Sequence, residues 1–205
     1  MNPGTLNLNS YKEVIMPQKK EIGPVYQIKI TLKDFKPAIW RRVLVPGYYT
    51  LARLHRVVQY AMGWTESHLH CFRVGRECYS LPEPGTDWGD SGDRDSRRVR
   101  LEQIAPSEKM KFIYDYDFGD GWEHQILVEK ILPPDPEMKH PLCLAGKGAC
   151  PPEDVGGVWG YADFPAAISD PEHEEHDSLL EWVGGEFDPD KFDSENTNMA
   201  LRMIK

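Results

Sequence analysis

The segment with the clearest chemical potential is the run 114–124, in which aromatic residues alternate with carboxylates before an Asp-Gly pair and a histidine. Asp120-Gly121 between alternating segments predicts a hairpin with a two-residue type I′ turn, because both central residues need positive φ. That register places Asp117 across the ladder from His124, with Asp115 on the same face. A carboxylate beside an imidazole holds its tautomer and raises its basicity, which suits a general base or a metal ligand. The alternative is an ordinary cross-strand polar pair.

A second candidate is the His68-Leu69-His70 triplet, within a strand expected over 68–74. Residues two apart on a strand share a face, so both imidazoles would point the same way. Such a pair can chelate a divalent ion when a third ligand arrives from elsewhere. The alternative is two unrelated histidines on a polar sheet face. Because both interpretations remain open, the sequence does not define a cofactor. The residues that could supply the third ligand are Asp115, Asp117, His124, Glu153 and Asp154.

Glu153 and Asp154 belong to the loop 151–157, which reads Pro-Pro-Glu-Asp-Val-Gly-Gly. This loop could present two carboxylates or form an anion nest, or its glycines could simply meet a need for positive φ. The sequence contains no phosphate-binding loop, no dinucleotide-binding glycine motif and no nucleophile elbow. The segment 172–176 carries histidines three apart, not the four of a zinc-protease helix, and it reads as an acidic helix start.

Composition limits the class of protein. A chain of 205 residues with a net charge of −9 suits one domain that can bury a core without disulfides. Net acidity makes nucleic acid a poor partner, because phosphate neutralisation supplies most non-specific affinity. The sequence has no apolar run long enough to span a bilayer, and the N-terminus has no apolar core of a secretion signal. We therefore expect a cytoplasmic protein with no membrane partner.

The four cysteines are expected to be reduced, given the cytoplasmic location. Their spacing does not match the two to four residues of a zinc knuckle, which leaves a four-cysteine zinc site as the less favoured alternative. The residues are Cys71, Cys78, Cys143 and Cys150.

Periodicity and turn residues predict an α+β fold: a compact single domain, mainly an antiparallel sheet from two hairpins packed with several helices. We expect a polar tail over 1–23 and the domain over 24–205. Thr50 is a good N-cap for a helix over 51–62, and Gly63 is placed to end it. The other expected elements are hairpins of 25–32 with 39–45 and 110–118 with 122–132, a helical turn at 101–104, helices at 161–169, after Asp170 and from Ser194, and loops at 82–98 and 141–161.

Several motifs, in this order, resemble the plasmid pRiA open-reading-frame-three-like family. The resemblance covers about residues 24–200 and implies a compact α+β domain. Some members are labelled resolvase-like (TnpR-like) passenger proteins of insertion elements, which implies a link to mobile elements. The matching motifs are Tyr26-Gln-Ile-Lys-Ile, Pro37-Ala-Ile-Trp-Arg-Arg, Gly63-Trp64, His68-Leu-His-Cys-Phe, the run 114–124, Pro152-Glu-Asp-Val-Gly-Gly and Gly160-Tyr161.

The residues themselves argue against recombination. Neither an activated serine among arginines nor a dispersed Arg-His-Arg-Tyr set can be assembled, and the acidic charge opposes tight DNA binding.

We predict a binding or adaptor module for a ligand or protein partner that the sequence does not define. The alternative is a metal-dependent hydrolase or nuclease that uses the same acids and imidazoles to activate water. Candidate contact aromatics around the pocket are Trp40, Trp64 and Trp122. The predicted polar pocket is lined by His68, His70, Asp115, Asp117, His124, Glu153 and Asp154.

Overall fold

The computed structural model describes residues 22–82 and 92–204. Residues 1–21 of the predicted tail and 83–91 of the predicted loop lie outside that description. The strands are β1 (Val25–Leu32), β2 (Trp40–Pro46), β3 (His70–Val74), β4 (Glu77–Ser80), β5 (Arg94–Asp95), β6 (Lys111–Tyr116), β7 (Trp122–Leu132) and β8 (Leu142–Lys147). The helices are α1 (Leu51–Met62), α2 (Leu101–Ile104), α3 (Gly157–Ser169), α4 (His176–Trp182) and α5 (Ser194–Leu201).

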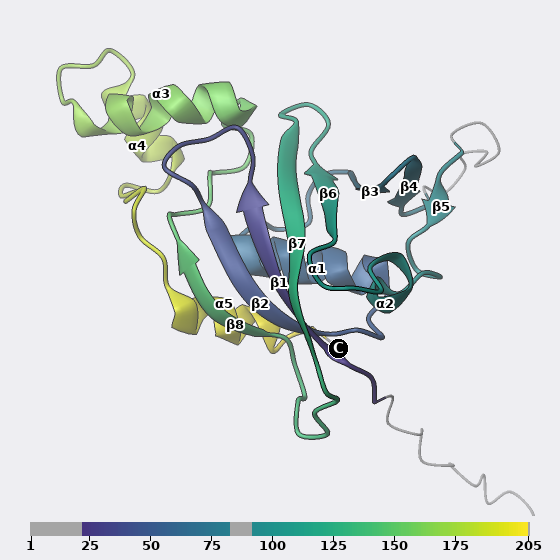
Figure 1. The fold of residues 1–205 in the computed structure, drawn as a ribbon. Coiled ribbons are helices and arrows are strands. Elements are labelled where there is room, and N and C mark those ends of the chain that lie inside the picture. Colours follow the sequence, from purple (N-terminus) through teal and green to yellow (C-terminus); the bar gives the residue numbers. More distant parts are fainter. Residues whose placement is uncertain (1–21, 83–91, 205) are drawn as a thin grey trace, which may run out of the picture.

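Within the described residues, eight strands form a single sheet in the order β5-β4-β3-β6-β7-β1-β2-β8 (Figure 1). Every neighbouring pair is antiparallel except β4 and β5. The predicted α+β class with a mainly antiparallel sheet is therefore confirmed. None of the described helices combines the length and the apolar character that a bilayer crossing requires.

The two predicted hairpins form the centre of the sheet. Strand β1 pairs with β2 on one side and with β7 on the other. Its inward residues are almost fully buried, as the alternating pattern predicts. Strand β8, by contrast, lies in a segment predicted to be a loop. Gly146 interrupts its apolar alternation, and the ladder with β2 forms a strand that the local sequence does not indicate.

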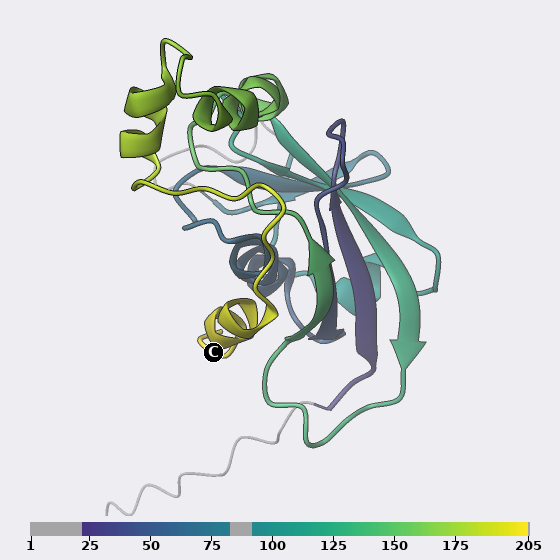
Figure 2. The same ribbon diagram turned by 90° about the vertical axis from the view of Figure 1, so that its left-hand side faces the viewer.

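Helix α1 follows its sequence cues. Thr50 accepts a hydrogen bond from the N–H of Arg53, and Gly63 closes the helix with a φ of 119°. Figure 2 shows α1 and α5 on the same face of the sheet, where they cover its apolar side. Helix α5 is capped by Asp193, and Asn198 exchanges hydrogen bonds of 2.8 and 3.0 Å with the backbone of Cys143 in β8.

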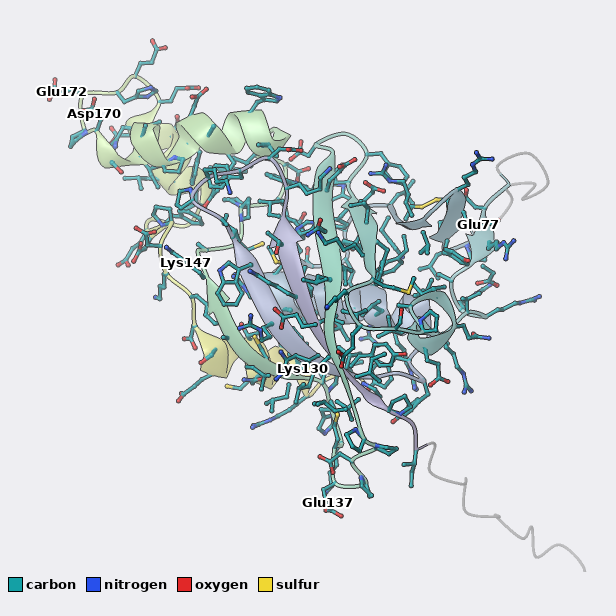
Figure 3. All side chains as sticks on the ribbon, in the orientation of Figure 1. Glu77, Lys130, Glu137, Lys147, Asp170 and Glu172 are labelled. Carbon is teal, nitrogen blue, oxygen red and sulfur yellow. A yellow bond between two sulfur atoms is a disulfide. The ribbon has the colours of Figure 1, made fainter. Side chains whose placement is uncertain are left out.

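Two helix boundaries differ from the predictions. Helix α3 begins at Gly157, four residues before the predicted start at 161. The helix predicted directly after Asp170 is absent there, and α4 begins only at His176. The Asp170 carboxylate instead accepts the N–H of Glu172, which closes a turn rather than starting a helix. Figure 3 places both residues at an outer corner of the molecule, where no core contact favours a helix.

The cysteines also differ from the expectation of four reduced thiols. Cys71 and Cys78 form a disulfide between β3 and β4, with their Cα atoms 6.2 Å apart. Cys143 and Cys150 are free thiols. Two of the four sulfurs are therefore already joined, and the alternative of a four-cysteine zinc site does not hold.

Three histidines lie inside the core beside Tyr114. The rings of His55 and His70 stack with centroids 3.5 Å apart, and His55 shares a 2.7 Å hydrogen bond with the Tyr114 hydroxyl. His124 is fully buried, and neither of its ring nitrogens has a hydrogen-bond partner among the described residues. Burial disfavours the charged imidazolium and lowers the pKa of His55 to about 2, of His124 to about 3 and of His70 to about 4.

These histidines should make the protein acid-sensitive. The unfolded chain takes up protons near pH 6.5, whereas the folded chain excludes them until about pH 4, so stability is full above pH 6.5 and falls as the pH drops. The slope is about 2 kcal/mol per pH unit at pH 6.5, where the unfolded imidazoles are half protonated, and it approaches about 4 kcal/mol per pH unit below about pH 5.5, where unfolding takes up three protons. Urea unfolding followed by tryptophan fluorescence between pH 7.5 and 5 measures it, in a window above the carboxylate titrations.

His124→Gln should flatten that slope by about a third, since one of three linked protons is removed. His140→Gln is the matched control, because His140 is exposed and lies outside the buried histidine group. A stability that stays constant from pH 6.5 to 5 would contradict the buried neutral histidines.

Candidate functional site

The connection between β6 and β7 is longer than predicted, and this changes the site. It spans 117–121, with Tyr116 opposite Trp122 as the last pair of the ladder. Asp117 closes the connection: its φ is 53°, its Oδ1 accepts the N–H of Gly119 at 3.0 Å, and its carbonyl accepts the N–H of Gly121. An aspartate that bonds to its own backbone two residues on, in the left-handed region, is a turn-former in its own right. The predicted two-residue turn was therefore wrong.

The new register separates Asp117 from His124. His124 pairs with Tyr114 and points into the core, so the predicted Asp117–His124 pair does not form. The shift is an odd number of residues, which turns every side chain of one strand to the other face. Asp115 accordingly lies on the outer face opposite Glu123, and Arg73 bridges the two carboxylates.

His68 and His70 do not lie on the same face of a strand. The strand begins at His70, whose ring is buried on the inward face against His55. His68 precedes the strand and is only half-buried. The expectation that both imidazoles share one face is therefore wrong, because residue 68 lacks the extended backbone on which that argument depended.

Four of the seven predicted residues do converge. The Nδ1 of His68 lies 3.7 Å from Oδ2 of Asp117, and its Nε2 lies 3.3 Å from Oδ1 of Asp154 and 3.8 Å from Oε2 of Glu153. We call His68, Asp117, Glu153 and Asp154 the polar cluster. They come from three separate connections: His68 lies between α1 and β3, Asp117 between β6 and β7, and Glu153 and Asp154 between β8 and α3.

Neighbouring residues hold the polar cluster and its loop in place, and of these the sequence singled out only Trp64, as a contact aromatic. The Glu153 carboxylate accepts the Tyr116 hydroxyl at 3.1 Å and the Thr65 N–H at 3.0 Å. The indole N–H of Trp64 donates to the carbonyl of Pro151. Tyr116 is the last inward-facing aromatic residue of β6, and this place in the alternating pattern was the sequence cue that could have identified it. Burial and the nearby Glu153 raise the pKa of its hydroxyl well above the usual range, so the hydroxyl stays protonated and can donate a hydrogen bond.

The glycine pair of the 151–157 loop has a structural role. Gly156 donates its N–H to Oδ2 of Asp120, at 3.2 Å, which ties this loop to the β6–β7 connection. A Cβ on Gly157 would lie 2.2 Å from the carbonyl oxygen of Asp120, and its φ is 68°. Gly157 thus permits the close approach of two backbones, and both glycines have positive φ, as that interpretation of the motif expects.

The exposed aromatic residues near the polar cluster are not the predicted Trp64 and Trp122. Trp64 and Trp122 are buried in the core. The large apolar side chains exposed on the segments that carry the polar cluster, or next to them, are Leu69, Phe118 and Trp159, the last with 88% of its surface exposed. Leu69 and Phe118 follow His68 and Asp117 directly in sequence.

The polar cluster can hold a divalent cation. One ligand atom from each of His68, Asp117 and Asp154 lies within 4.8 Å of the other two. An imidazole with two carboxylates is a donor set for zinc, manganese or iron. Glu153 lies beside this set, with its Oε2 at 3.8 Å from Nε2 of His68.

Comparison with known proteins agrees with the fold. Residues 24–196 match the family model described as plasmid pRiA4b ORF-3-like protein. The chain belongs to this family. Among family relatives, the uncharacterized protein y4hQ of Sinorhizobium fredii is 46% identical over 164 residues, 80% of this chain and 82% of that protein. A crystal structure of MM3350 from Methanosarcina mazei Go1, titled a protein of unknown function, superposes with a TM-score of 0.76 at 34% identity, over 86% of this chain and 98% of that one.

The contact between Gly157 and Asp120 gives a direct test of the site architecture. Gly157→Ala should destabilise the protein by about 2–4 kcal/mol, because it adds left-handed strain to a backbone clash. Gly75→Ala is the matched control, since Gly75 also has positive φ but open space around its Cα, and about 1 kcal/mol is expected. Urea denaturation compares the two, and equal losses would contradict the close approach.

Proposed function

We propose that this protein is a binding module whose ligand site is the polar cluster, and that the site takes a divalent cation. The observation that carries the proposal is the convergence of one imidazole and three carboxylates from three segments on His68. Like charges so close together repel, and a cation of charge two would remove that repulsion. Functional sites often show such unfavourable arrangements in the free protein.

The surroundings support a partner as well as an ion. Leu69, Phe118 and Trp159 expose apolar surface on the segments around the cluster. Interface hot spots are enriched in tryptophan and other aromatic residues, and the rim around them is polar. In this proposal the cation orders the three connections, and the exposed side chains then contact the partner. The resemblance implies a link to mobile elements for some family members. In this proposal, that link concerns only the kind of partner, which would be a protein associated with such an element.

Titration of the purified chain with Zn²⁺ and Mn²⁺ by calorimetry tests the cation. One site per chain is expected. Asp117→Asn and Asp154→Asn should each weaken binding by about 10–100-fold, since each removes a charged ligand. Both asparagines tolerate the left-handed backbone at these positions, so the fold should survive.

Asp115→Asn is the matched control, because Asp115 lies on the same hairpin two residues from Asp117 but on the outer face with Arg73. Its affinity for the ion should equal that of the unmodified chain. The proposal fails if no ion binds, or if the Asp115 variant loses as much affinity as the Asp117 variant.

A metal-dependent hydrolase is the second candidate, and the position of Glu153 favours it. Its Oε2 lies 3.8 Å from Nε2 of His68, just beyond the three-residue donor set. A carboxylate there could accept a proton from a water molecule held by the cation. The same convergence would then activate water as well as bind an ion.

Hydrolysis of bis(p-nitrophenyl) phosphate by the Mn²⁺-loaded protein separates the two candidates. The hydrolase predicts turnover that Glu153→Gln abolishes while ion affinity falls little. An ion-loaded protein without turnover would remove the hydrolase and leave the binding module.

A further inference from the structure

A buried arginine with unused donors lies beside a second cavity. Arg41 points from β2 to the inward face of the sheet with only 2% of its surface exposed. Its Nε donates to the carbonyl of Ala61, and its Nη1 donates to those of Trp40 and Lys147, at 2.9–3.0 Å. Figure 3 labels Lys147, which marks this end of β8. Three of the five donors are thereby used, and Nη2 has no hydrogen-bond partner among the described residues.

The charge of Arg41 also lacks a counter-ion. No carboxylate of the described residues forms an ion pair with it, and the Phe192 ring packs 4.4 Å from its Cζ. The titratable groups that act on it are Cys150, Cys143 and Tyr161. Burial raises the pKa of all three, so each is neutral at neutral pH. Three carbonyl oxygens accept from this guanidinium, but no carboxylate of the described residues pairs with it. Because a buried charge without an ion-pair partner is costly, an anionic group at Nη2 would be favourable.

The fold makes room for this arrangement. A Cβ on Gly146 would lie 2.9 Å from Cδ of Arg41 and 2.7 Å from the Phe192 ring. The segment between α4 and α5, yellow in Figures 1 and 2, passes beside α1 and β8 and is fixed there by the N–H of Ala149 bonding to the carbonyl of Pro189. Because residue 146 is a glycine, the Arg41 side chain and the Phe192 ring can pack together against β8 without a steric clash.

The cavity beside Arg41 has a volume of about 410 Å³, which is within the range of small-molecule sites, ~300–1,000 Å³. It shares no lining residue with the polar cluster. Glu186, Asp188 and Asp193 lie around it, against one further cation, Lys191. Glu186 has no ion pair among the described residues. The wall side chains with apolar or aromatic character are Tyr60, Met62, Ala149, Phe187, Phe192 and Ala200.

We propose that this cavity binds a small zwitterion, with the carboxylate of the ligand on Nη2 of Arg41 and its ammonium group among the acidic side chains. The single guanidinium suits a carboxylate, whereas the three acids would repel a doubly charged phosphate. The apolar walls accommodate a side chain between the two charges. Free amino acids are the simplest molecules with this chemistry, and the site is independent of the function proposed for the polar cluster.

Calorimetry and thermal unfolding of the full chain with each of the L-amino acids test the proposal. At least one amino acid should bind in a 1:1 ratio and raise the Tm. Acetate and ethylamine, which carry one charge each, should bind at least about tenfold more weakly, and inorganic phosphate should not bind, because each offers only part of the recognised pattern.

Variants assign the binding to this cavity. Ala200→Leu fills the cavity and Glu186→Gln removes an acid, and each should weaken binding about tenfold or more. Glu181→Gln on α4 lies outside the cavity and should change nothing, as should Asp117→Asn in the polar cluster. Arg41→Met should abolish binding; if it does not fold, the Ala200 and Glu186 variants decide. The proposal is overturned if no amino acid binds, if acetate or phosphate binds as tightly as the amino acid, or if Ala200→Leu keeps full affinity.

Discussion

The turn closed by Asp117 decides which residues of this protein can meet. It fixes the register of β6 against β7, and that register sends Tyr114, Tyr116, Trp122 and His124 into the core. With β7 in its present orientation, a two-residue turn would have buried Asp115 and Asp117 of the β6 side in place of Tyr114 and Tyr116. The aromatic layer, the buried histidines and the polar cluster all depend on this one short connection.

That register is unfavourable for His124, because it buries the imidazole in the core. A fully buried imidazole loses its hydrogen bonds to water, and the ring nitrogens of His124 have no hydrogen-bond partner among the described residues. The aromatic rings around it offset the loss through packing, with Trp64 edge-on at 5.1 Å. The same aromatic layer packs against Tyr116, whose hydroxyl donates a hydrogen bond to Glu153. The core is therefore connected to the polar cluster by direct contacts.

The sequence predicted most elements because their cues are local. Alternation gave β1 within its bounds, and Thr50 and Gly63 gave α1. What failed was decided by partners distant in sequence. Strand β8 exists because β2 pairs with it, and Asp115 and His124 left the predicted pocket because Asp117 formed its own turn. The structure brings His68, Asp117, Glu153 and Asp154 together, although the hairpin argument that linked Asp117 to His124 was wrong.

The hydrogen bonds between Asn198 and Cys143 have a consequence for solubility. Strand β8 ends the sheet, and an open strand edge can recruit a strand from another molecule. The amide of Asn198 occupies the backbone N–H and carbonyl of Cys143 as a neighbouring strand would. Helix α5 therefore acts as a guard against self-association, and a chain truncated before Asp193 would aggregate by edge pairing rather than remain a merely weakened monomer.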